Sequence, residues 1–298
     1  VSGLLMKLTG SIGEDISLMD GALNTARAFD IIKREFDSLD GRHCVLYAVD
    51  GLVKDTVLTE SLNFFMRFSS GEIRDVPYIE TERLGMANDA AAGVLRGGTA
   101  LLIDGSDEAL IMYARSYPLR SIEEPENDKV LRGPRDGFGE SVILNTSLIR
   151  RRIRDPLLCT EKVTVGKETE TDVALCYLDG KADRAFVRKI KKMLGDINTN
   201  SLNMGAESIA EMLIPRRWYN PFPKIRYTER PDTACSHITE GSVIVICDNY
   251  PAVMILPTGI FDFLQETDDF YFPPLVGTYL RLIRGGIIVL TLLMLPTW

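Results

Sequence analysis

Three aspartates are candidates for metal chemistry because each ends an apolar, strand-like run. Asp50, Asp104 and Asp179 are each followed by a glycine. In α/β enzymes an acid at the carboxyl end of a strand can hold Mg²⁺, which makes a phosphotransferase or hydrolase one interpretation of these turns. Such a site also needs a second acid, and the candidates lie in ordinary turn sequence: Asp55, Asp107 and Asp183. We therefore favour structural turns, and we expect no enzyme activity, no bound metal and no cofactor.

The other groups that could do chemistry follow no catalytic or metal-binding pattern. His43 and His237 are far apart in the sequence, which argues against a zinc site. The sequence contains no G-x-S-x-G motif, so a hydrolytic triad lacks its usual nucleophile. Five cysteines form an odd set without a C-x-x-C pair, as buried thiols in a reducing compartment do: Cys44, Cys159, Cys176, Cys235 and Cys247.

The segment "RGPRDGFGE" (132–140) raises the question of a phosphate loop, a hinge or a tight connector. Its three glycines follow neither G-x-x-x-x-G-K-[ST] nor G-x-G-x-x-G. Glu140 would repel an anion at the start of the following helix, and Pro134 removes one backbone donor. We therefore interpret the segment as a connector that fixes two parts of the chain.

Side chains of this connector have expected structural roles. Phe138 stands between two glycines and is expected to be a buried anchor, while Glu140 begins the next helix. Arg132 and Arg135 are expected to pair with the acids of 123–128 or to reach a partner subunit. These contacts would position the segment more than they would stabilise it.

The helix that follows carries three consecutive arginines. In "LIRRRIR" (148–154), Leu148, Ile149 and Ile153 lie on one side and the arginines on the others. A solvated helix face is the default interpretation. Contact with acidic partners or lipid head groups is the alternative.

Composition and periodicity define the elements that must position these residues. The chain has 298 residues, is 45% hydrophobic and carries a net charge of −8, which allows a sizeable core and disfavours a nucleic-acid partner. In the first half, apolar spacing predicts helices over 21–39, 53–68 and 86–98, a strand over 43–51, and a β-hairpin over 99–114.

The second half repeats this order of elements. A strand over 172–180 again ends in Asp-Gly, helices follow over 181–197 and 204–214, and two apolar runs over 241–257 form a hairpin. We therefore predict two related α/β lobes, each a mixed small sheet flanked by helices. The expected divisions are 21–114 (first lobe), 115–171 (interlobe connector and arginine-rich helix), 172–267 (second lobe) and 268–298 (juxtamembrane segment).

The C-terminal run 285–298 is almost wholly apolar but shorter than the roughly 20 residues that a spanning helix needs. Arg281 and Arg284 precede it, and such residues tend to stay on the cytoplasmic side. We expect the truncated start of a transmembrane helix, with the preceding part facing the cytoplasm. The alternative is a buried C-terminal helix of a soluble protein.

The longest block of recognisable sequence is "RSIEEPENDKVLRGPRDGFGESVILNTSLIRRRIRDPLL" (120–158). It resembles the signature of the GerA family of spore germination proteins, of the A-subunit type. Further similar segments are "GGTALLIDG" (97–105), "ERPD" (229–232) and "EGSVIVICDNYPAVMILP" (240–257). "PPLVGTYLRLIR" and "FDIIKREF" are similar to the stage V sporulation AF branch of the family.

This resemblance implies a two-lobe, cytoplasm-facing N-terminal domain, followed by a membrane bundle in the inner membrane of a bacterial endospore. The family takes part in nutrient-triggered germination and in the accompanying ion movement, and the implied partners are other germination subunits, with self-association left open. A small-molecule sensor with its ligand between the lobes is the alternative. The residues expected at interfaces are Arg132, Arg135, Asp136, Phe138, Glu140, Arg150, Arg151 and Arg152.

Overall fold

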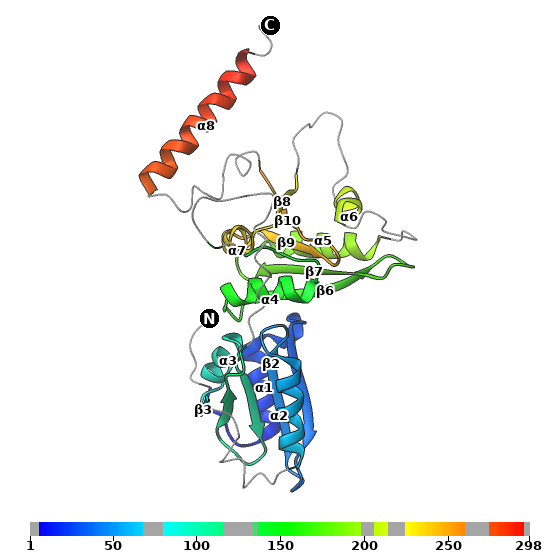
Figure 1. Ribbon diagram of the computed structural model, residues 1–298, viewed down its shortest axis with the longest axis vertical. Coiled ribbons are helices and arrows are strands. Elements are labelled where there is room, and N and C mark those ends of the chain that lie inside the picture. The colour runs from blue at the N-terminus through cyan, green and yellow to red at the C-terminus, as the bar shows by residue number, and fades with distance from the viewer. Residues whose placement is uncertain are drawn as a thin grey trace.

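The computed structural model describes residues 6–67, 80–115, 134, 136–197, 206–213, 224–259 and 274–294. Two α/β lobes follow one another along its long axis, and a C-terminal helix lies beyond the second lobe (Figure 1). Each lobe is built around one five-stranded sheet.

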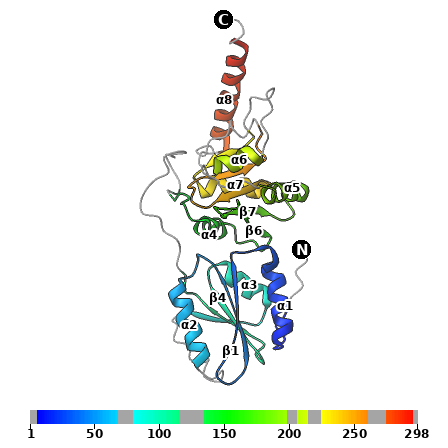
Figure 2. The ribbon, with the colours of Figure 1, turned by 90° about the vertical axis from the view of Figure 1, so that its right-hand side faces the viewer.

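The first lobe is a sheet of strand order β1-β2-β4-β5-β3 in which every pair of neighbours is antiparallel. Helices α1 and α3 cover one face of the sheet and α2 covers the other (Figure 2). The elements are α1 (Ile12–Leu23), the 3-10 turn η1 (Thr25–Arg27), β1 (Ile31–Asp37), β2 (His43–Val49), α2 (Asp55–Arg67), β3 (Thr81–Leu84), α3 (Ala87–Leu95), β4 (Thr99–Ile103) and β5 (Ala109–Met112).

The second lobe has the strand order β6-β7-β9-β10-β8, again with antiparallel neighbours. Helices α4 and α7 pack on one face, and α5 and α6 pack on the other. The elements are α4 (Val142–Arg152), β6 (Leu158–Val165), β7 (Thr171–Leu178), α5 (Arg184–Gly195), α6 (Ala206–Leu213), β8 (Arg226–Thr228), α7 (Pro231–Glu240), β9 (Val243–Cys247) and β10 (Val253–Leu256).

The two lobes repeat one topology, with α1 equivalent to α4, β1 to β6, and α2 to α5. The repeat extends to single backbone bonds. The N–H of Asp50, just after β2, donates to the carbonyl of Asp30 at 2.7 Å, and the N–H of Asp179, just after β7, donates to that of Leu157 at 2.9 Å. The prediction of two related α/β lobes is confirmed, and the sheets, expected to be mixed, are antiparallel in every described pair.

Most elements were predicted, but the helix expected over 21–39 is wrong. Helix α1 ends at Leu23, and Ile31–Asp37 forms β1, which pairs with β2 along its whole length. The apolar spacing of 21–39 fits a helix, yet the fully buried β2 needs a partner at its free edge. Tertiary pairing overrides local periodicity here.

The predicted connector 115–171 extends too far, because α4 and β6 belong to the second lobe. All eight residues of β6 pair with β7, and α4 packs on the same sheet. The first lobe also begins earlier than residue 21, because α1 packs against its core. The part of the connector over 116–133 lies outside the described residues.

The five cysteines are free and buried, as the sequence predicted. Burial raises the pKa of the Cys44 thiol to about 11 and those of Cys235 and Cys247 to about 12. The thiolate is the reactive form of cysteine, so these groups act as small apolar side chains in the native protein.

Helix α8 (Pro274–Met294) is apolar along most of its length. Leu275 and Leu282 are 86% and 69% exposed. Within the described ranges, no helix combines the length and the apolarity that crossing a membrane requires. The start of a transmembrane helix at this end of the chain stays a prediction.

Candidate interlobe interface

A buried ion pair joins the two lobes. Asp30 lies between η1 and β1 in the first lobe, and Arg150 lies in the last turn of α4 in the second. Arg150 Nε donates to Asp30 Oδ2 at 2.7 Å and Nη2 donates to Oδ1 at 3.0 Å. The side chains are 0% and 2% exposed, so this two-bond contact is shielded from water. Two-bond pairing of this kind fixes both distance and orientation.

Further hydrogen bonds satisfy both members of the pair. Arg150 also donates to the carbonyls of Leu158 at 3.2 Å and Asp155 at 3.4 Å. The hydroxyl of Thr160 donates to Asp30 Oδ1. A buried charge is tolerated when its bonds are made in this way, and removing one partner leaves the other charge in an apolar environment.

Backbone and apolar contacts surround the ion pair. Ala28 and Thr160 form a parallel bridge, and the N–H of Phe29 donates to the carbonyl of Thr160 at 3.1 Å. The Phe29 side chain packs against the second lobe's core under α4 and α7. At the rim, Arg27 pairs with Asp179 at 3.4 Å. The first lobe is thus held to the second through the segment between α1 and β1.

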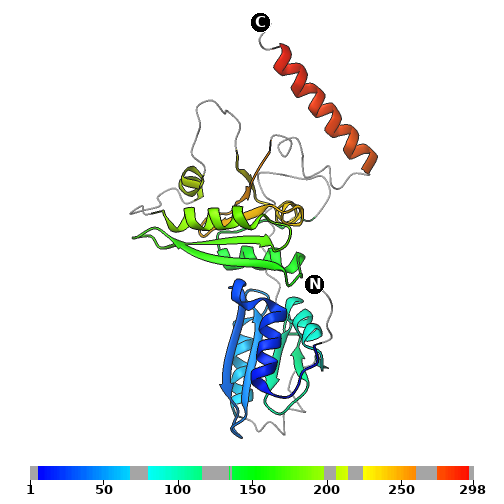
Figure 3. The ribbon, with the colours of Figure 1, turned by 180° about the vertical axis from the view of Figure 1, so that it is seen from behind.

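Gly51 marks a second point of close approach between the lobes. Its φ is +76°, which favours glycine, and a Cβ there would lie 2.9 Å from Ser147 Cβ on α4. The turn after β2 therefore packs directly against the helix of the other lobe. Figure 3 shows the two lobes meeting at this level from behind.

Gly51→Ala is expected to destabilise the protein by about 2–3 kcal/mol, because the new methyl group adds overpacking against α4 to the cost of a left-handed alanine. Gly41→Ala is the matched control, since Gly41 has φ +79° and a Cβ there would meet nothing within 4 Å. Urea unfolding of both variants measures the difference. Equal losses at the two positions would show that the approach to Ser147 is not tight.

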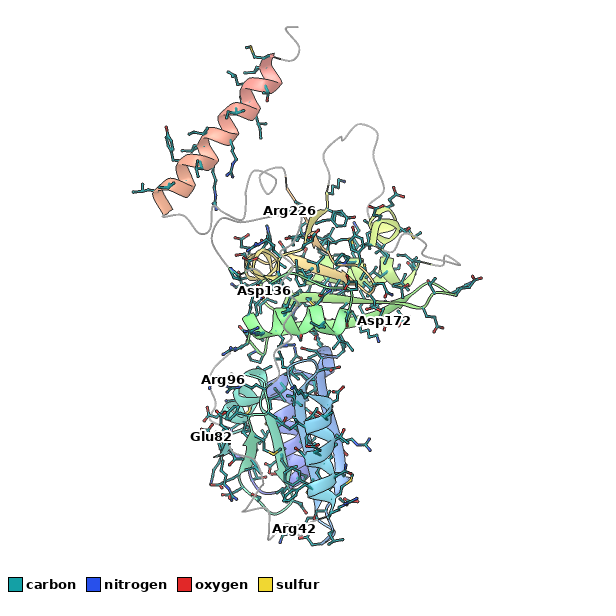
Figure 4. The ribbon with its side chains drawn as sticks, in the orientation of Figure 1. Arg42, Glu82, Arg96, Asp136, Asp172 and Arg226 are labelled. Carbon is teal, nitrogen blue, oxygen red and sulfur yellow. The ribbon has the colours of Figure 1, made fainter. Side chains whose placement is uncertain are left out.

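The connector is fixed to the second lobe through three of its residues. Phe138 is fully buried in that lobe's core, and its N–H donates to the carbonyl of Glu229 at 2.8 Å. Asp136 pairs with Arg152 at 2.7 Å, in the second lobe (Figure 4). Glu140 is exposed, and its carbonyl accepts from the N–H of Asn249 at 2.7 Å.

The remaining predicted positions fall in three places. Arg132, Arg135 and the acids of 123–128 lie outside the described residues. Arg151 and Arg152 are partly exposed on α4. Arg150 is buried, so the expectation of a solvated helix face for all three arginines is wrong at this position. The reason is that α4 lies between the lobes and the side of the helix that faces Asp30 is covered.

The sequence reasoning missed three polar residues that hold this region together. Asp30 and Thr160 complete the Arg150 contact. Arg230 is fully buried, pairs with Asp232 at 2.7 Å and donates to the carbonyl of Pro134 at 3.0 Å, which ties the connector to α7. One signal in the sequence is the helical period. It places Arg150 one turn after Thr146 on the same side of α4, and Thr146 is also buried.

The three aspartates considered for metal binding do not converge. Asp104 follows β4 and lies beside the start of β2, where its carboxylate accepts from the N–H of Ile12 at 3.3 Å. Asp50 lies beyond the other end of β2. Because β2 has seven residues, the two aspartates are about 20 Å apart. Asp179 is in the second lobe and pairs with Arg184 at 2.8 Å. The described ranges hold no group of three or more His, Cys, Asp or Glu that could bind a metal ion.

Asp50 has a raised pKa, caused first by its burial and then by the negative charge of Asp55. The folded protein therefore binds the proton of the Asp50 carboxyl more tightly than the unfolded chain does. The protein loses stability as the pH rises from the unfolded-chain pKa through the raised pKa of the folded state, because the carboxylate is then ionised in its partly buried site. Asp50→Asn is expected to melt at a higher temperature than the wild type at pH 7. The difference should disappear below about pH 4, the usual Asp pKa. A variant that melts lower at pH 7 would show that the carboxylate is stabilising.

Comparison with solved structures defines the class of fold. The N-terminal domain of the A subunit of the Bacillus megaterium spore germinant receptor GerK3 is similar, with a TM-score of 0.64 at 23% sequence identity. The match covers 86% of this chain and 98% of that one. At this level of identity, the likeness shows a shared two-lobe fold.

Sequence comparison then gives the family. The family model described as Bacillus/Clostridium GerA spore germination protein matches residues 19–298, and this chain belongs to the GerA family. It is 40% identical to stage V sporulation protein AF of Bacillus subtilis (strain 168) over 219 residues, covering 74% of this chain and 44% of the relative. It is 32% identical to spore germination protein KA of the same strain, covering 86% and 49%.

These findings confirm the family resemblance seen in the arginine-containing block. The stage V sporulation AF protein is among the relatives, as "PPLVGTYLRLIR" suggested. The chain spans about half the length of the curated relatives it matches.

Proposed function

We propose that this two-lobe unit is the N-terminal domain of a GerA-family membrane protein of the endospore, facing the cytoplasm. It assembles with other germination subunits and transmits a signal to a membrane bundle that takes part in germination and ion release. The observation that carries the proposal is the buried Asp30–Arg150 contact. Because it couples the lobes as one body, a displacement of either lobe is passed to the other.

The proposed role is non-enzymatic. Asp104 and Asp179 use their carboxylates in structural bonds in separate lobes, which leaves them poorly placed for a shared reaction. The buried cysteines have raised pKa values, which disfavours a thiolate nucleophile. What the domain offers instead is a rigid body with its connector fixed to the second lobe.

Arg135→Ala tests the assembly role. Arg135 precedes Asp136 in the connector, and we expect its guanidinium to reach a partner subunit in the proposed complex. The variant is expected to melt within about 2 °C of the wild type if this arginine acts in assembly and not in the fold of the isolated domain. Recovery of the other germination subunits with the tagged full-length protein should fall at least several-fold, and spores carrying the change should germinate more slowly.

Arg154→Ala is the matched control, because Arg154 is an exposed arginine two residues beyond α4. Normal subunit recovery and normal germination with Arg135→Ala would contradict the partner contact. A thermal-shift screen against amino acids, sugars and nucleotides covers the sensing alternative. A saturable rise in melting temperature with one of them would replace the assembly role with ligand sensing.

A further inference from the structure

Helix α5 carries an unusually one-sided charge. Its twelve residues include five cations and no acid, in a chain whose net charge is −8: Arg184, Arg188, Lys189, Lys191 and Lys192. The apolar side of the helix, formed by Val187, Ile190 and Leu194, is buried against the sheet. All five cations are therefore displayed on the solvent side of the second lobe.

Only some of these cations are used within the domain. Arg184 pairs with Asp179, and Lys191 pairs with Glu161. Arg188, Lys189 and Lys192 make no ion pair with any residue that the structure describes, and all three are exposed. These three residues, the basic face of α5, remain available to an anionic partner.

The spacing of the cations opposes the stability of the helix. Arg184 and Arg188, and Arg188 and Lys192, are four residues apart, so like charges lie on adjacent turns. Such pairs weaken a helix, although the N-cap Asp183 accepts from the N–H of Ala185 and stabilises its start. A bound anionic surface would turn this repulsion into attraction.

The position of α5 favours a lipid surface over an acidic protein. Helices α5 and α6 cover the face of the second sheet that points away from the first lobe, and α8 with its exposed apolar side chains lies on that same side (Figure 1). The basic face carries no fully exposed large apolar side chain, because Val187, Ile190 and Leu194 are buried and Phe186 and Met193 are partly buried against the same core. Protein interfaces usually depend on exposed apolar anchors, whereas lipid head groups require only charge.

We propose that the basic face of α5 binds the anionic head groups of the membrane into which the neighbouring C-terminal segment leads. This inference rests on the proposed membrane setting of the domain and adds a second contact with the bilayer. The contact fixes the second lobe's α5 side against the lipid and directs the first lobe away from it.

Residues 1–259 provide a suitable test, because they remove α8 and its own affinity for lipid. The four core clusters of the lobes end at Leu256, so the described part of α8 contributes nothing to them. Cooperative melting of this fragment checks its folding first. Co-sedimentation is then measured with vesicles of phosphatidylcholine alone and of phosphatidylcholine mixed with phosphatidylglycerol.

The variant combines Arg188→Gln, Lys189→Gln and Lys192→Gln. It is expected to bind mixed vesicles about 100-fold more weakly than the unmodified fragment, since each basic residue near an anionic surface contributes several-fold. The control combines Arg34→Gln, Lys54→Gln and Lys167→Gln, which remove the same charge from exposed sites elsewhere. It should lose less than about threefold, and salt should weaken the binding of the unmodified fragment.

Equal losses in the two triple variants would overturn the proposal, because binding would then follow net charge and not this face. Equal sedimentation of the unmodified fragment with neutral and mixed vesicles would overturn it as well. Binding to polyglutamate but not to mixed vesicles would assign the face to an acidic protein instead. None of these results affects subunit recovery with Arg135→Ala, so the assembly role can fail or stand independently.

Discussion

Arg150→Met is expected to lower the free energy of unfolding by about 3–5 kcal/mol, the cost of leaving a buried carboxylate without its counter-charge. Asp30 is 2% exposed and keeps only the Thr160 hydroxyl as a side-chain donor after the change. Water cannot reach the carboxylate unless the lobes separate. Part of the loss should therefore appear as separation of the lobes, measurable as an increase in the radius of gyration by small-angle scattering.

Arg154→Met is the control for this experiment, since it makes the same replacement at an exposed arginine two residues beyond α4. Arg150→Met combined with Asp30→Leu should recover much of the loss, because the double variant has no uncompensated charge. Urea unfolding of the wild type, Arg150→Met, Asp30→Leu and the double variant gives the coupling energy of the pair. If Arg150→Met costs no more than Arg154→Met, the pair does not hold the lobes together.

Phe138→Ala is expected to cost about 3–5 kcal/mol, as removal of a fully buried ring does. The ring lies in the second lobe's core under α4 and α7, the same cluster against which Phe29 of the first lobe packs. The cavity thus weakens the second lobe directly and the support beneath the interlobe contact indirectly. Phe138→Leu should cost less, because it retains part of the volume.

Leu144→Ala on α4 is the appropriate comparison, because Leu144 is 41% exposed and should lose under about 1 kcal/mol. Thermal melting and urea unfolding of Phe138→Ala, Phe138→Leu and Leu144→Ala rank the three variants. A Phe138→Ala protein that melts like the wild type would show that the connector is not anchored by its aromatic ring.

The elements that the sequence identified carry a plain local signal, either one apolar stripe at helical spacing or a short continuous apolar run. Helix α5 has one apolar stripe and was predicted almost to its ends, as were the hairpins β4–β5 and β9–β10. Strand β1 was missed because its apolar residues also fit a helix, and only pairing with β2 decides between the two. The two strands are joined by only five residues (38–42), so their pairing is local, but the apolar spacing of 21–39 does not reveal it.

Helix α4 was harder for a different physical reason. It lies between a sheet and the other lobe, so its buried residues run almost continuously from Asn145 to Arg150 and show no clear polar side. The Asp30–Arg150 pair spans 120 positions, and an isolated aspartate in "AFDIIKREF" carries no local signal of burial. Such a contact could be found only from the folded structure.

The repeated topology raises the question of which lobes can pair with each other. They meet through equivalent regions, the helix-to-strand segment and the Asp-Gly turn of each, as the two halves of a twofold dimer would. The charges break this pseudo-symmetry, since the position equivalent to Asp30 is Leu157. In a pairing of two first lobes each Asp30 would lack the arginine that it meets in the second lobe, and in a pairing of two second lobes each Arg150 would meet Leu157 in place of Asp30. Burial of an unpaired charge thus disfavours both homotypic pairings and leaves first-with-second as the favoured one, so the charges would keep two chains from pairing through lobes of the same kind.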